Sequence, residues 1–306
     1  MDRIAVVVVH YNTNQDTDEC LKSLSKLKKA DWKQRIYVVD NGSKEEYHPP
    51  KLRGLGDLEV LRSESNLGFT GGTNLGMKHA LEEFEADYLL LLNSDTLVEP
   101  TFLKKLYQAA KEQPDSGILN PLVYFAREYE YHLDSYQSDE LGKVIWYAGG
   151  SIDWEHIVGF HRGVDELDRG QFAQDINPLK SQFATGCCML VKREVIETIG
   201  YMDESFFLYW EDVDYSLRAR LAGFELTLVP EAIIWHKNAG SSEGAGSQLQ
   251  QYYQTRNRFA LAFRYGGAKV KFQALRLASR IFFEGGIGMR AVFDAFIGRM
   301  GKRAIV

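Results

Sequence analysis

The chain has 306 residues, of which 45% are hydrophobic and 25% are charged, and its formal net charge is −6. These values suit a globular protein of one large domain or two, and they exclude the disordered and fibrous classes. No apolar run approaches the roughly 18–20 residues of a transmembrane helix, and the β-branched run near the N-terminus is too short for the core of a signal peptide.

Strands and helices are predicted to alternate along the N-terminal part of the chain. Buried apolar runs predict strands at 4–9, 35–43, 58–63 and 87–95, and helical periodicity predicts helices at 16–28, through 75–84 and after Pro100. This alternation is typical of an α/β fold with a mostly parallel, doubly wound sheet, which binds ligands beyond the carboxyl ends of its strands. Polar clusters occupy three of those ends, at 10–12, 40–43 and 93–95.

The glycine-rich stretch 66–77, NLGFTGGTNLGM, fits neither common phosphate-binding template. Its glycines lack the spacing of the dinucleotide fingerprint. Gly71 and Gly76 have the spacing of a P-loop, but the lysine comes one position late and the hydroxyl residue is missing. This argues against a dehydrogenase or an ATPase. We expect the glycines to let the backbone approach a bound ligand, with Asn66 and Asn74 fixing the loop by side-chain hydrogen bonds.

Two aspartates at strand ends are candidate ligand-binding residues. Asp95 follows the apolar run YLLLL, and a carboxylate there, with Asn93 beside it, suits a hard cation that carries a diphosphate. The alternative is an Asx turn or an N-cap for the helix that Pro100 opens. Asp40, in VVDNGS, has the same two interpretations, because Asn-Gly after a strand is ordinary turn chemistry.

After Tyr124 the alternating pattern stops. Residues 127–180 are rich in Tyr, Asp, Gly and Trp and have no helical period, which predicts an inserted β-hairpin region or mobile loops. Regular elements resume at 187–200 and 224–236. The three cysteines, Cys20, Cys187 and Cys188, form no Cys-x-x-Cys pair, so we expect no disulfide framework or zinc site and a reducing, cytoplasmic location.

Glu211, Asp212 and Asp214 lie directly after an aromatic run. Repulsion among such carboxylates, or burial against aromatic rings, raises the pKa of one of them, and a raised pKa suits a general base. If 211–221 is helical, Asp214 pairs with Arg218, while Leu217 and Leu221 face the core. The alternative is that the acids cap the first turn of this helix.

Two further residues have a functional and a structural interpretation. His236 ends the apolar strand AIIWH; a lone histidine there is either a hydrogen-bonded core residue or a metal ligand. Arg256, in QYYQTRN, either clamps a phosphate with its guanidinium group or lies on a helix surface.

Basic residues are concentrated at the C-terminus. From Arg264 onward there are nine Lys or Arg and two acids, so this tail carries a net charge of +7 and the remainder −13. The negative net charge of the rest of the chain argues against nucleic-acid binding. Apolar residues interleave the basic ones, which predicts an amphipathic helix; it lies either on an anionic membrane surface or on its own domain.

Taken together, the motifs resemble the family-2 inverting glycosyltransferases of the GT-A fold, and within them the rhamnosyltransferase-like branch. The resemblance runs from Ile4 to about Tyr265. It is carried by segments that follow one another in the family's order: VVVVHYN, VVDNGS, NLGFTGGTNLGM, LLNSDTLVEP, IWYAGGSIDW, GFHRGVDELDRGQF, FATGCCMLVKREV, MDESFFLYWEDVDYSLRAR, VPEAIIWHKNAGSS and YYQTRN.

The resemblance implies a role for each candidate residue. Asp212 matches the catalytic base, with Glu211 as its nearest rival. Asp95 matches the last acid of the Asp-x-Asp metal motif, whose first acid is Asn93 here, and His236 matches a further metal ligand. The implied nucleotide-binding residues are His10, Tyr11, Asn12, Asp40, Asn66, Asn93 and Asp95. Those implied beside the donor sugar and the acceptor are Thr185, Gly186, Trp210 and Arg256.

The implied function is an inverting, metal-dependent glycosyltransferase with Mg²⁺ or Mn²⁺ as cofactor. The implied donor is a nucleotide-diphospho-sugar, dTDP-rhamnose, and the transferred sugar is rhamnose. The implied acceptor is a polysaccharide or a polyprenyl-linked glycan. The implied location is the cytoplasm, with the protein bound peripherally to the inner face of the membrane. The alternatives are a UDP-sugar donor and a nucleotide-sugar-binding protein without activity. The expected organisation is a GT-A domain at 1–263, divided into a nucleotide-binding half (1–123), an insert (124–180) and a catalytic half (181–263), followed by the basic helical tail at 264–306.

Overall fold

The computed structural model describes residues 1–28, 30–172, 181–238 and 246–304. Residues 173–180 of the expected insert and 305–306 of the expected tail therefore lie outside the described part. The strands are β1 (Asp2–His10), β2 (Trp32–Asn41), β3 (Asp57–Ser63), β4 (Tyr88–Asn93), β5 (Thr96–Val98), β6 (Ser116–Phe125), β7 (Ile145–Tyr147), β8 (Gly150–Asp153), β9 (Val158–His161), β10 (Cys188–Lys192) and β11 (Glu225–His236). The helices are α1 (Asn14–Leu24), α2 (Gly68–Glu82), α3 (Phe102–Glu112), the 3₁₀ helix η1 (Leu133–Ser135), α4 (Arg193–Ile199), α5 (Glu211–Leu221), α6 (Gln248–Tyr265), α7 (Ala268–Glu284) and α8 (Gly286–Phe296).

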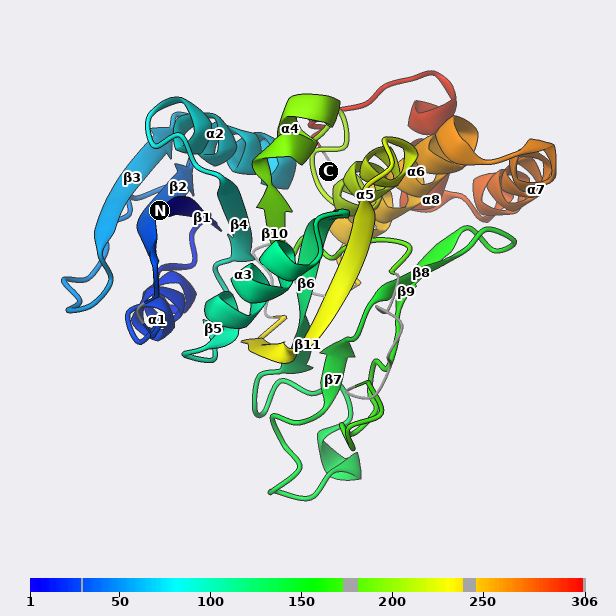
Figure 1. Cartoon of the computed structure of the whole chain (residues 1–306). Coiled ribbons are helices and arrows are strands. Elements are labelled where there is room, and N and C mark those ends of the chain that lie inside the picture. Colours follow the sequence, from blue (N-terminus) through cyan, green and yellow to red (C-terminus); the bar gives the residue numbers. More distant parts are fainter. Residues whose placement is uncertain (29, 173–180, 239–245, 305–306) are drawn as a thin grey trace.

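A central sheet with the strand order β3-β2-β1-β4-β10-β6-β11-β5 runs through the molecule, and β7 pairs with β6 (Figure 1). The N-terminal strands β3, β2, β1 and β4 are parallel to one another, as are β6 and β11. The strands β10, β5 and β7 run antiparallel to their partners. The predicted α/β fold is confirmed, with a sheet that is parallel in its N-terminal half and mixed beyond β4.

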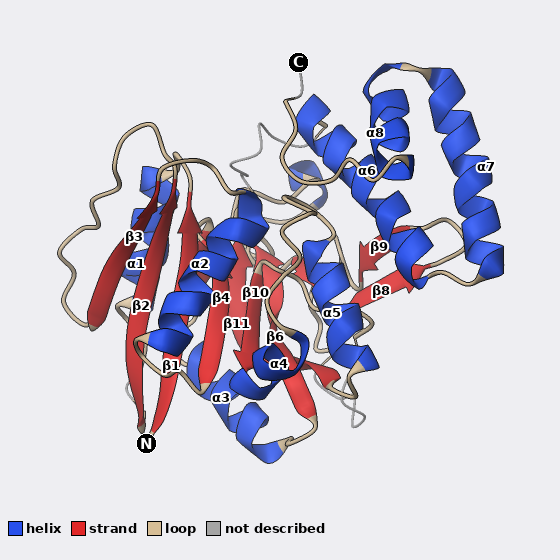
Figure 2. Ribbon diagram, turned by 90° about the horizontal axis from the view of Figure 1, so that it is seen from above, coloured by secondary structure: helices blue, strands red, loops and turns tan. Residues whose placement is uncertain are grey.

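Helices cover both faces of the sheet, as Figure 2 shows. Along β1, Ile4, Val6 and Val8 pack in one cluster with the apolar residues of α1 and α3, whereas Ala5 and Val7 pack in another with those of α2 and α4. Successive side chains of a strand point to opposite faces, so a continuous apolar run is what a strand covered on both sides requires. This is why the unbroken runs in the sequence predicted β1, β2 and β4 correctly.

The glycine-rich stretch differs from the prediction, because α2 already begins at Gly68. A Cβ atom on Gly76 would lie 2.3 Å from Val7 Cγ1, and one on Gly72 would lie 3.0 Å from Val9 Cγ1. These two glycines therefore let α2 pack closely on β1, rather than bringing backbone to a nucleotide. Asn74 fixes the helix, as expected, by exchanging hydrogen bonds with the backbone N–H and C=O of Met202.

The segment between β6 and β10 contains β7 and the antiparallel hairpin β8–β9, so the expected hairpin region is confirmed. The C-terminal part forms α6, α7 and α8, which lie beside α5 in Figure 1. None of the helices in the described part of the chain combines the length and the apolarity that crossing a bilayer requires.

Candidate functional site

The strand register places the three predicted polar clusters at one edge of the sheet. His10, the last residue of β1, lies opposite Asp40 on β2, and its neighbour Val9 lies opposite Asn93 on β4. Because these parallel strands end together, the side chains that follow them gather where such sheets bind ligands. The sequence predicted this gathering correctly.

Pairing between β5 and β11 brings Asp95 and His236 together across 141 residues of sequence. Thr96 is the register partner of His236, so the aspartate just before β5 meets the last residue of β11. The Asp95 Oδ1 and His236 Nε2 atoms are 3.1 Å apart, and both side chains are buried. Trp146 packs edge-on against the imidazole ring, with 4.4 Å between ring centroids, and fixes its orientation.

These two side chains fit a divalent cation. Adjacent corners of an octahedron of oxygen and nitrogen ligands about 2.1 Å from a metal are separated by about 3 Å, which matches the spacing of Asp95 Oδ1 and His236 Nε2. Two protein ligands leave coordination positions for the oxygens of a diphosphate, the arrangement that Mg²⁺ prefers in nucleotide sites. Within the described residues, the one group of three potential ligand side chains is Glu59 on β3, His79 on α2 and Glu83 at the end of α2, and it includes neither Asp95 nor His236.

Asp40 is buried and held in its ionised form. Its carboxylate accepts the backbone N–H groups of Ser43 and Tyr47, each at 3.1 Å, and forms an ion pair with Arg62. Burial alone would raise the pKa of Asp40, but these hydrogen bonds and the charge of Arg62 outweigh it, so the pKa is lowered. Asp40 therefore carries a full negative charge at neutral pH. The sequence did not identify Arg62 as its partner.

The turn after β1 is hydrogen-bonded to the turn after β2. Asn12 adopts a left-handed backbone with φ +55°, donates its N–H to Ser43 Oγ and accepts the N–H of Lys44 through its side chain. His10 stacks on Tyr47, with 4.3 Å between ring centroids, and burial lowers its pKa. Tyr11, between them, is half-buried.

Asn66 caps the start of α2. Its side-chain oxygen accepts the N–H of Gly68 at 2.8 Å, and Gly68 itself needs a left-handed backbone with φ +76°. A Cβ atom on Gly68 would lie 2.3 Å from the carbonyl oxygen of Phe207. The glycine at this position therefore lets the start of α2 contact the aromatic loop, Phe206–Trp210, that precedes α5.

Glu211 and Asp212 open helix α5, which spans the residues that the sequence predicted. Asp212 is half-buried, and its Oδ2 accepts the N–H of Gly186 at 2.9 Å. Burial raises the pKa of Asp212. Burial and the adjacent charge of Asp212 raise the pKa of Glu211 well above the ordinary range, and its Oε2 has no hydrogen-bond partner among the described residues. Of the two carboxylates, Asp212 is the more accessible and the more acidic.

One segment joins the acidic pair to the metal-binding candidates. Gly186 donates its N–H to Asp212, and the carbonyl of the next residue, Cys187, accepts the N–H of Asn93 at 2.9 Å. Asp212 and the cluster 93–95 therefore flank the same short stretch of backbone. Thr185, just before it, is buried, and a Cβ atom on Gly186 would contact Phe69 at 3.2 Å and Asp212 at 3.4 Å.

The different environments of the two acids lead to a prediction. The unfolded chain ionises Glu211 near its ordinary pKa, about 4.3, whereas the folded chain keeps its proton to higher pH, so this group costs stability as pH rises above that range. We expect Glu211→Gln to raise the melting temperature at pH 7, by about 2–4 °C for each kcal/mol recovered, and to leave it unchanged near pH 4. Thermal melts from pH 4 to 8 test this; a lower melting temperature at pH 7 would mean that Glu211 is ionised in the folded protein.

The aromatic loop before α5 has an unusual backbone. Phe207, Tyr209 and Trp210 have φ values of +64°, +67° and +69°, a conformation that costs a residue with a side chain about 1 kcal/mol or more. The side-chain amide of Asn257, on α6, donates to the carbonyls of Phe206, Leu208 and Tyr209 at 2.8–3.0 Å. This one side chain therefore holds the loop that positions Trp210 and the acids after it.

Arg256, next to Asn257, serves the same loop and not a phosphate. Its guanidinium group is fully buried and donates to the carbonyls of Ser205, Phe206 and Gly301. With these donors engaged by backbone, the structure does not support the predicted phosphate clamp. Trp210 is buried as well, and its indole N–H donates to Gln254 of α6 at 2.9 Å.

The role of Asn257 can be measured. Asn257→Ala removes the donor that the carbonyls of Phe206, Leu208 and Tyr209 share, and we expect it to lower the free energy of unfolding by about 1–3 kcal/mol and to reduce the activity of the site, because Trp210 and Asp212 lose their support. Melting curves and initial rates of the variant check this. Gln108→Ala, at an exposed position of α3, is the matched control and should change neither. Wild-type values for Asn257→Ala would contradict the assignment.

Arg162 is a candidate site residue to which the sequence assigned no role. Its Nε and Nη2 atoms are buried and, among the described residues, have no hydrogen-bond partner. A Cβ atom on Gly149 would lie 2.0 Å from Arg162 Nη2, so the turn at 149–150 is shaped around the guanidinium group. Arg162 directly follows β9, and the β8–β9 hairpin packs near the start of α5, since a Cβ atom on Gly159 would lie 3.7 Å from the ring of Trp210. The HRG triplet in the sequence was the available signal.

Known proteins resemble most of this chain. The glycosyl transferase family 2 profile matches residues 5–200. The low-salt glycan biosynthesis hexosyltransferase Agl10 of Haloferax volcanii is 24% identical over 259 residues, which cover 85% of this chain and 75% of the relative. The N-acetylglucosaminyl-diphospho-decaprenol L-rhamnosyltransferase of Mycobacterium tuberculosis is 24% identical over 276 residues, 87% of this chain and 86% of the relative. The dTDP-rhamnosyl transferase RfbF of Shigella flexneri is 24% identical over 84% of this chain and 79% of its own.

A solved structure shares the architecture. GalNAc-T7, crystallised with UDP, GalNAc and Mn²⁺, superposes with a TM-score of 0.66 at 17% identity, over 99% of this chain and 55% of that chain. At this identity the likeness establishes the fold and not the substrate. The α/β fold expected from the sequence is thus similar to that of solved glycosyltransferases.

Proposed function

The chain belongs to glycosyl transferase family 2, and from that premise we propose that this glycosyltransferase transfers rhamnose from dTDP-rhamnose to a hydroxyl group of a polysaccharide or lipid-linked glycan, with inversion at the anomeric carbon. The observation that carries the proposal is the backbone stretch Gly186–Cys187. It is bonded on one side to Asp212 and on the other to the strand end that bears Asp95.

In the proposed reaction Asp212 is the general base. Its carboxylate takes the proton from the acceptor hydroxyl; the acceptor oxygen forms a bond to the anomeric carbon while the bond to the diphosphate oxygen breaks on the opposite face. The Gly186 N–H donates to Oδ2 of Asp212, and the N–H of Val213, in the first turn of α5, donates to Oδ1, so both oxygens are oriented. A single base and a single displacement imply inversion. Burial raises the pKa of Asp212, which makes it a better proton acceptor than an exposed aspartate.

Asp95 and His236 would hold the divalent cation, Mg²⁺ or Mn²⁺. Such a cation neutralises the charge that develops on the leaving nucleoside diphosphate. The arrangement of Asp95 and His236 supports this role. Trp146 orients the imidazole ring, and the pairing of β5 with β11 holds the two side chains together without a ligand. GalNAc-T7 was crystallised with Mn²⁺, which favours a divalent metal in this fold.

The nucleotide is proposed to lie along the strand ends between Asp40 and Asn93. Asp40 would accept a hydrogen bond from the pyrimidine base, with His10, Tyr11 and Asn12 beside the base and the ribose. Asn66 would close this side of the nucleotide from the start of α2. The two residues Thr185 and Gly186 would form the floor beside the sugar, and Trp210 the wall on the acceptor side.

The lipid-linked acceptor is supported by the relatives. The mycobacterial relative is named for an N-acetylglucosaminyl-diphospho-decaprenol acceptor. A diphosphate in the acceptor needs a cation, and Arg162 offers buried guanidinium nitrogens without protein partners in the described part of the chain. We assign Arg162 to the phosphate groups that reach the catalytic half.

A donor screen tests the proposed function. The folded protein is melted with dTDP-rhamnose, UDP-galactose, UDP-N-acetylglucosamine or GDP-mannose, each with and without Mn²⁺, and donors that stabilise it are then tested for hydrolysis. We expect dTDP-rhamnose to stabilise the protein in the presence of Mn²⁺. Stabilisation by a UDP-sugar instead would replace the donor and keep the chemistry; stabilisation by none would contradict the function.

A further inference from the structure

Helices α7 and α8 form a hairpin that packs on α6 through one face only. The residues of that face are small or half-buried, with Ala274, Ala278 and Val292 packed against Phe259 and Ala262 of α6. The alternative in which the basic tail packs on its own domain is therefore correct for this face. The opposite face of the hairpin is exposed.

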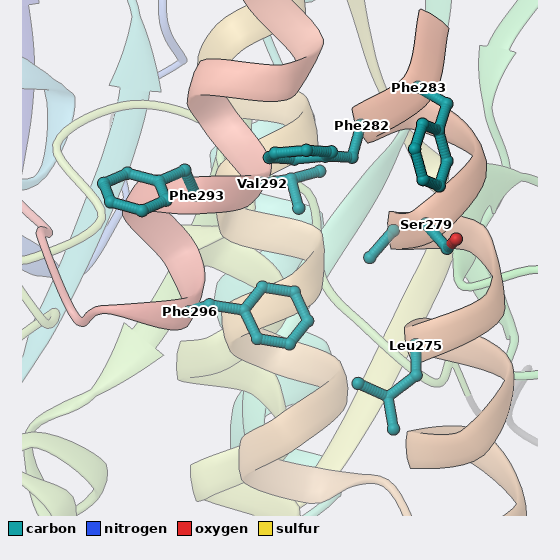
Figure 3. Close-up of a pocket in the computed structure, with 8 residues that line it drawn as sticks. Leu275, Ser279, Phe282, Phe283, Val292, Phe293 and Phe296 are labelled. Carbon is teal, nitrogen blue, oxygen red and sulfur yellow. The ribbon is translucent and has the colours of Figure 1, made fainter. Parts of the chain in front are cut away.

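Aromatic side chains cover that opposite face. On α7, Phe283 is 85% exposed and Phe272 is 62% exposed, and Phe293 on α8 is 51% exposed. A groove of about 280 Å³ lies between the two helices, and its lining includes Leu275, Phe282, Phe293 and Phe296, which are labelled in Figure 3. Soluble surfaces rarely gather so many large apolar side chains in one place.

Basic residues outnumber acidic residues on this hairpin, so its net charge is positive. At 100° per residue, Lys269, Arg276 and Arg280 fall along one side of the exposed apolar stripe of α7. The tail from Arg264 onward holds two acids. Glu284 is paired with Arg280, and Asp294 is buried and accepts a hydrogen bond from Tyr252. An apolar stripe flanked by cations is complementary to an anionic lipid surface, whereas the body of the molecule carries −13 and is repelled by it.

We propose that the hairpin α7–α8 lies in the interface of an anionic membrane. Phe272, Phe283 and Phe293 enter the boundary between headgroups and acyl chains, and the flanking Lys and Arg residues contact lipid phosphates. The surface is defined as the membrane face, formed by Phe272, Leu275, Phe282, Phe283, Met289, Phe293, Phe296 and Ile297 with Lys269, Arg276 and Arg280.

The membrane face is connected rigidly to the candidate active site. Helix α6 packs against both helices of the hairpin and also supplies Asn257 and Gln254, which hold the aromatic loop and Trp210. The chain after α8 returns to the same place, where Lys302 donates to the carbonyl of Asn66 and Gly301 bonds to Ser205. Docking therefore fixes the site at one height and orientation relative to the lipid surface. This inference does not depend on which sugar is transferred.

Vesicle binding tests the membrane face. The full chain is mixed with vesicles of phosphatidylcholine alone or with phosphatidylglycerol added, and the bound fraction is measured by flotation. We expect binding to the anionic vesicles only, weakened by salt. The double variant Phe272→Ser/Phe283→Ser should lower the partition coefficient by about ten-fold or more, and Arg276→Glu/Arg280→Glu by at least as much.

Matched controls separate the membrane face from general effects. Leu221→Ser removes an apolar side chain that is 77% exposed on α5, and Lys104→Glu reverses an exposed charge on α3. Both controls should bind as the wild type does, and all variants should melt at the wild-type temperature. Wild-type protein that ignores anionic vesicles, or a double variant that binds as well as the controls, overturns the proposal. A dimer that Phe272→Ser/Phe283→Ser abolishes, with no vesicle binding, would assign the face to a second copy of the chain instead.

Discussion

We expect Asp212→Asn to lower the rate of sugar transfer by roughly 10²–10⁴-fold while donor binding stays close to the wild-type level. The amide cannot accept the acceptor proton, and general base catalysis contributes about this factor. The substitution keeps the shape of the side chain, so the hydrogen bond from the Gly186 N–H to the remaining oxygen should survive. Initial rates and donor affinity, measured on the same preparation, check both parts.

Glu211→Gln is the matched variant for this experiment. Glu211 is buried and its pKa is raised well above the ordinary range, so the amide resembles its protonated form and transfer should continue. If Glu211→Gln stops transfer and Asp212→Asn does not, the base is Glu211. If Asp212→Asn loses donor binding as strongly as it loses rate, Asp212 is part of the donor site and not the base.

The second large effect is expected at the pair Asp95 and His236. Asp95→Asn removes the one negative ligand of the pair, since Asn93 already replaces the first acid of the motif. We expect the variant to lose the Mn²⁺-dependent part of donor binding, about 100-fold in affinity or more, while the metal-independent part remains. Calorimetric titration of the donor with and without Mn²⁺ measures both parts.

A control is available among the other potential metal ligands. Glu83→Gln changes the group Glu59, His79 and Glu83, in which Glu83 itself is exposed at the end of α2, and it should leave Mn²⁺-dependent donor binding intact. His236→Ala should behave like Asp95→Asn. Unchanged metal dependence in both Asp95→Asn and His236→Ala would show that their 3.1 Å contact is a structural hydrogen bond.

Local sequence patterns predicted the features that depend on a few neighbouring residues. The limits of α5 and the pair of Asp214 with Arg218 follow from a four-residue spacing, and the structure has both, with 2.9 Å between Arg218 Nε and Asp214 Oδ2. Leu221 was assigned to the core by the same periodicity and is 77% exposed, at the last residue of α5. Periodicity does not tell where a partner surface stops.

Features that depend on distant pairings could not be predicted from the residues alone. The contact of Asp95 with His236 requires the antiparallel pairing of β5 with β11, and β5 has only three residues. A helix surface was one of the two interpretations of Arg256, and this residue is buried because α6 packs on the aromatic loop. Gly72 and Gly76 resembled a ligand loop because glycine serves close helix packing and ligand contact equally well.

The anomeric configuration of the product tests the central claim most directly. The enzyme is incubated with Mn²⁺, its stabilising nucleotide-sugar and a lipid-linked acceptor analogue, and the anomeric proton and carbon of the new linkage are examined by NMR. A single displacement with Asp212 as the base predicts a linkage opposite in configuration to that of the donor, formed by the wild type and not by Asp212→Asn. A linkage that retains the donor configuration would contradict the account.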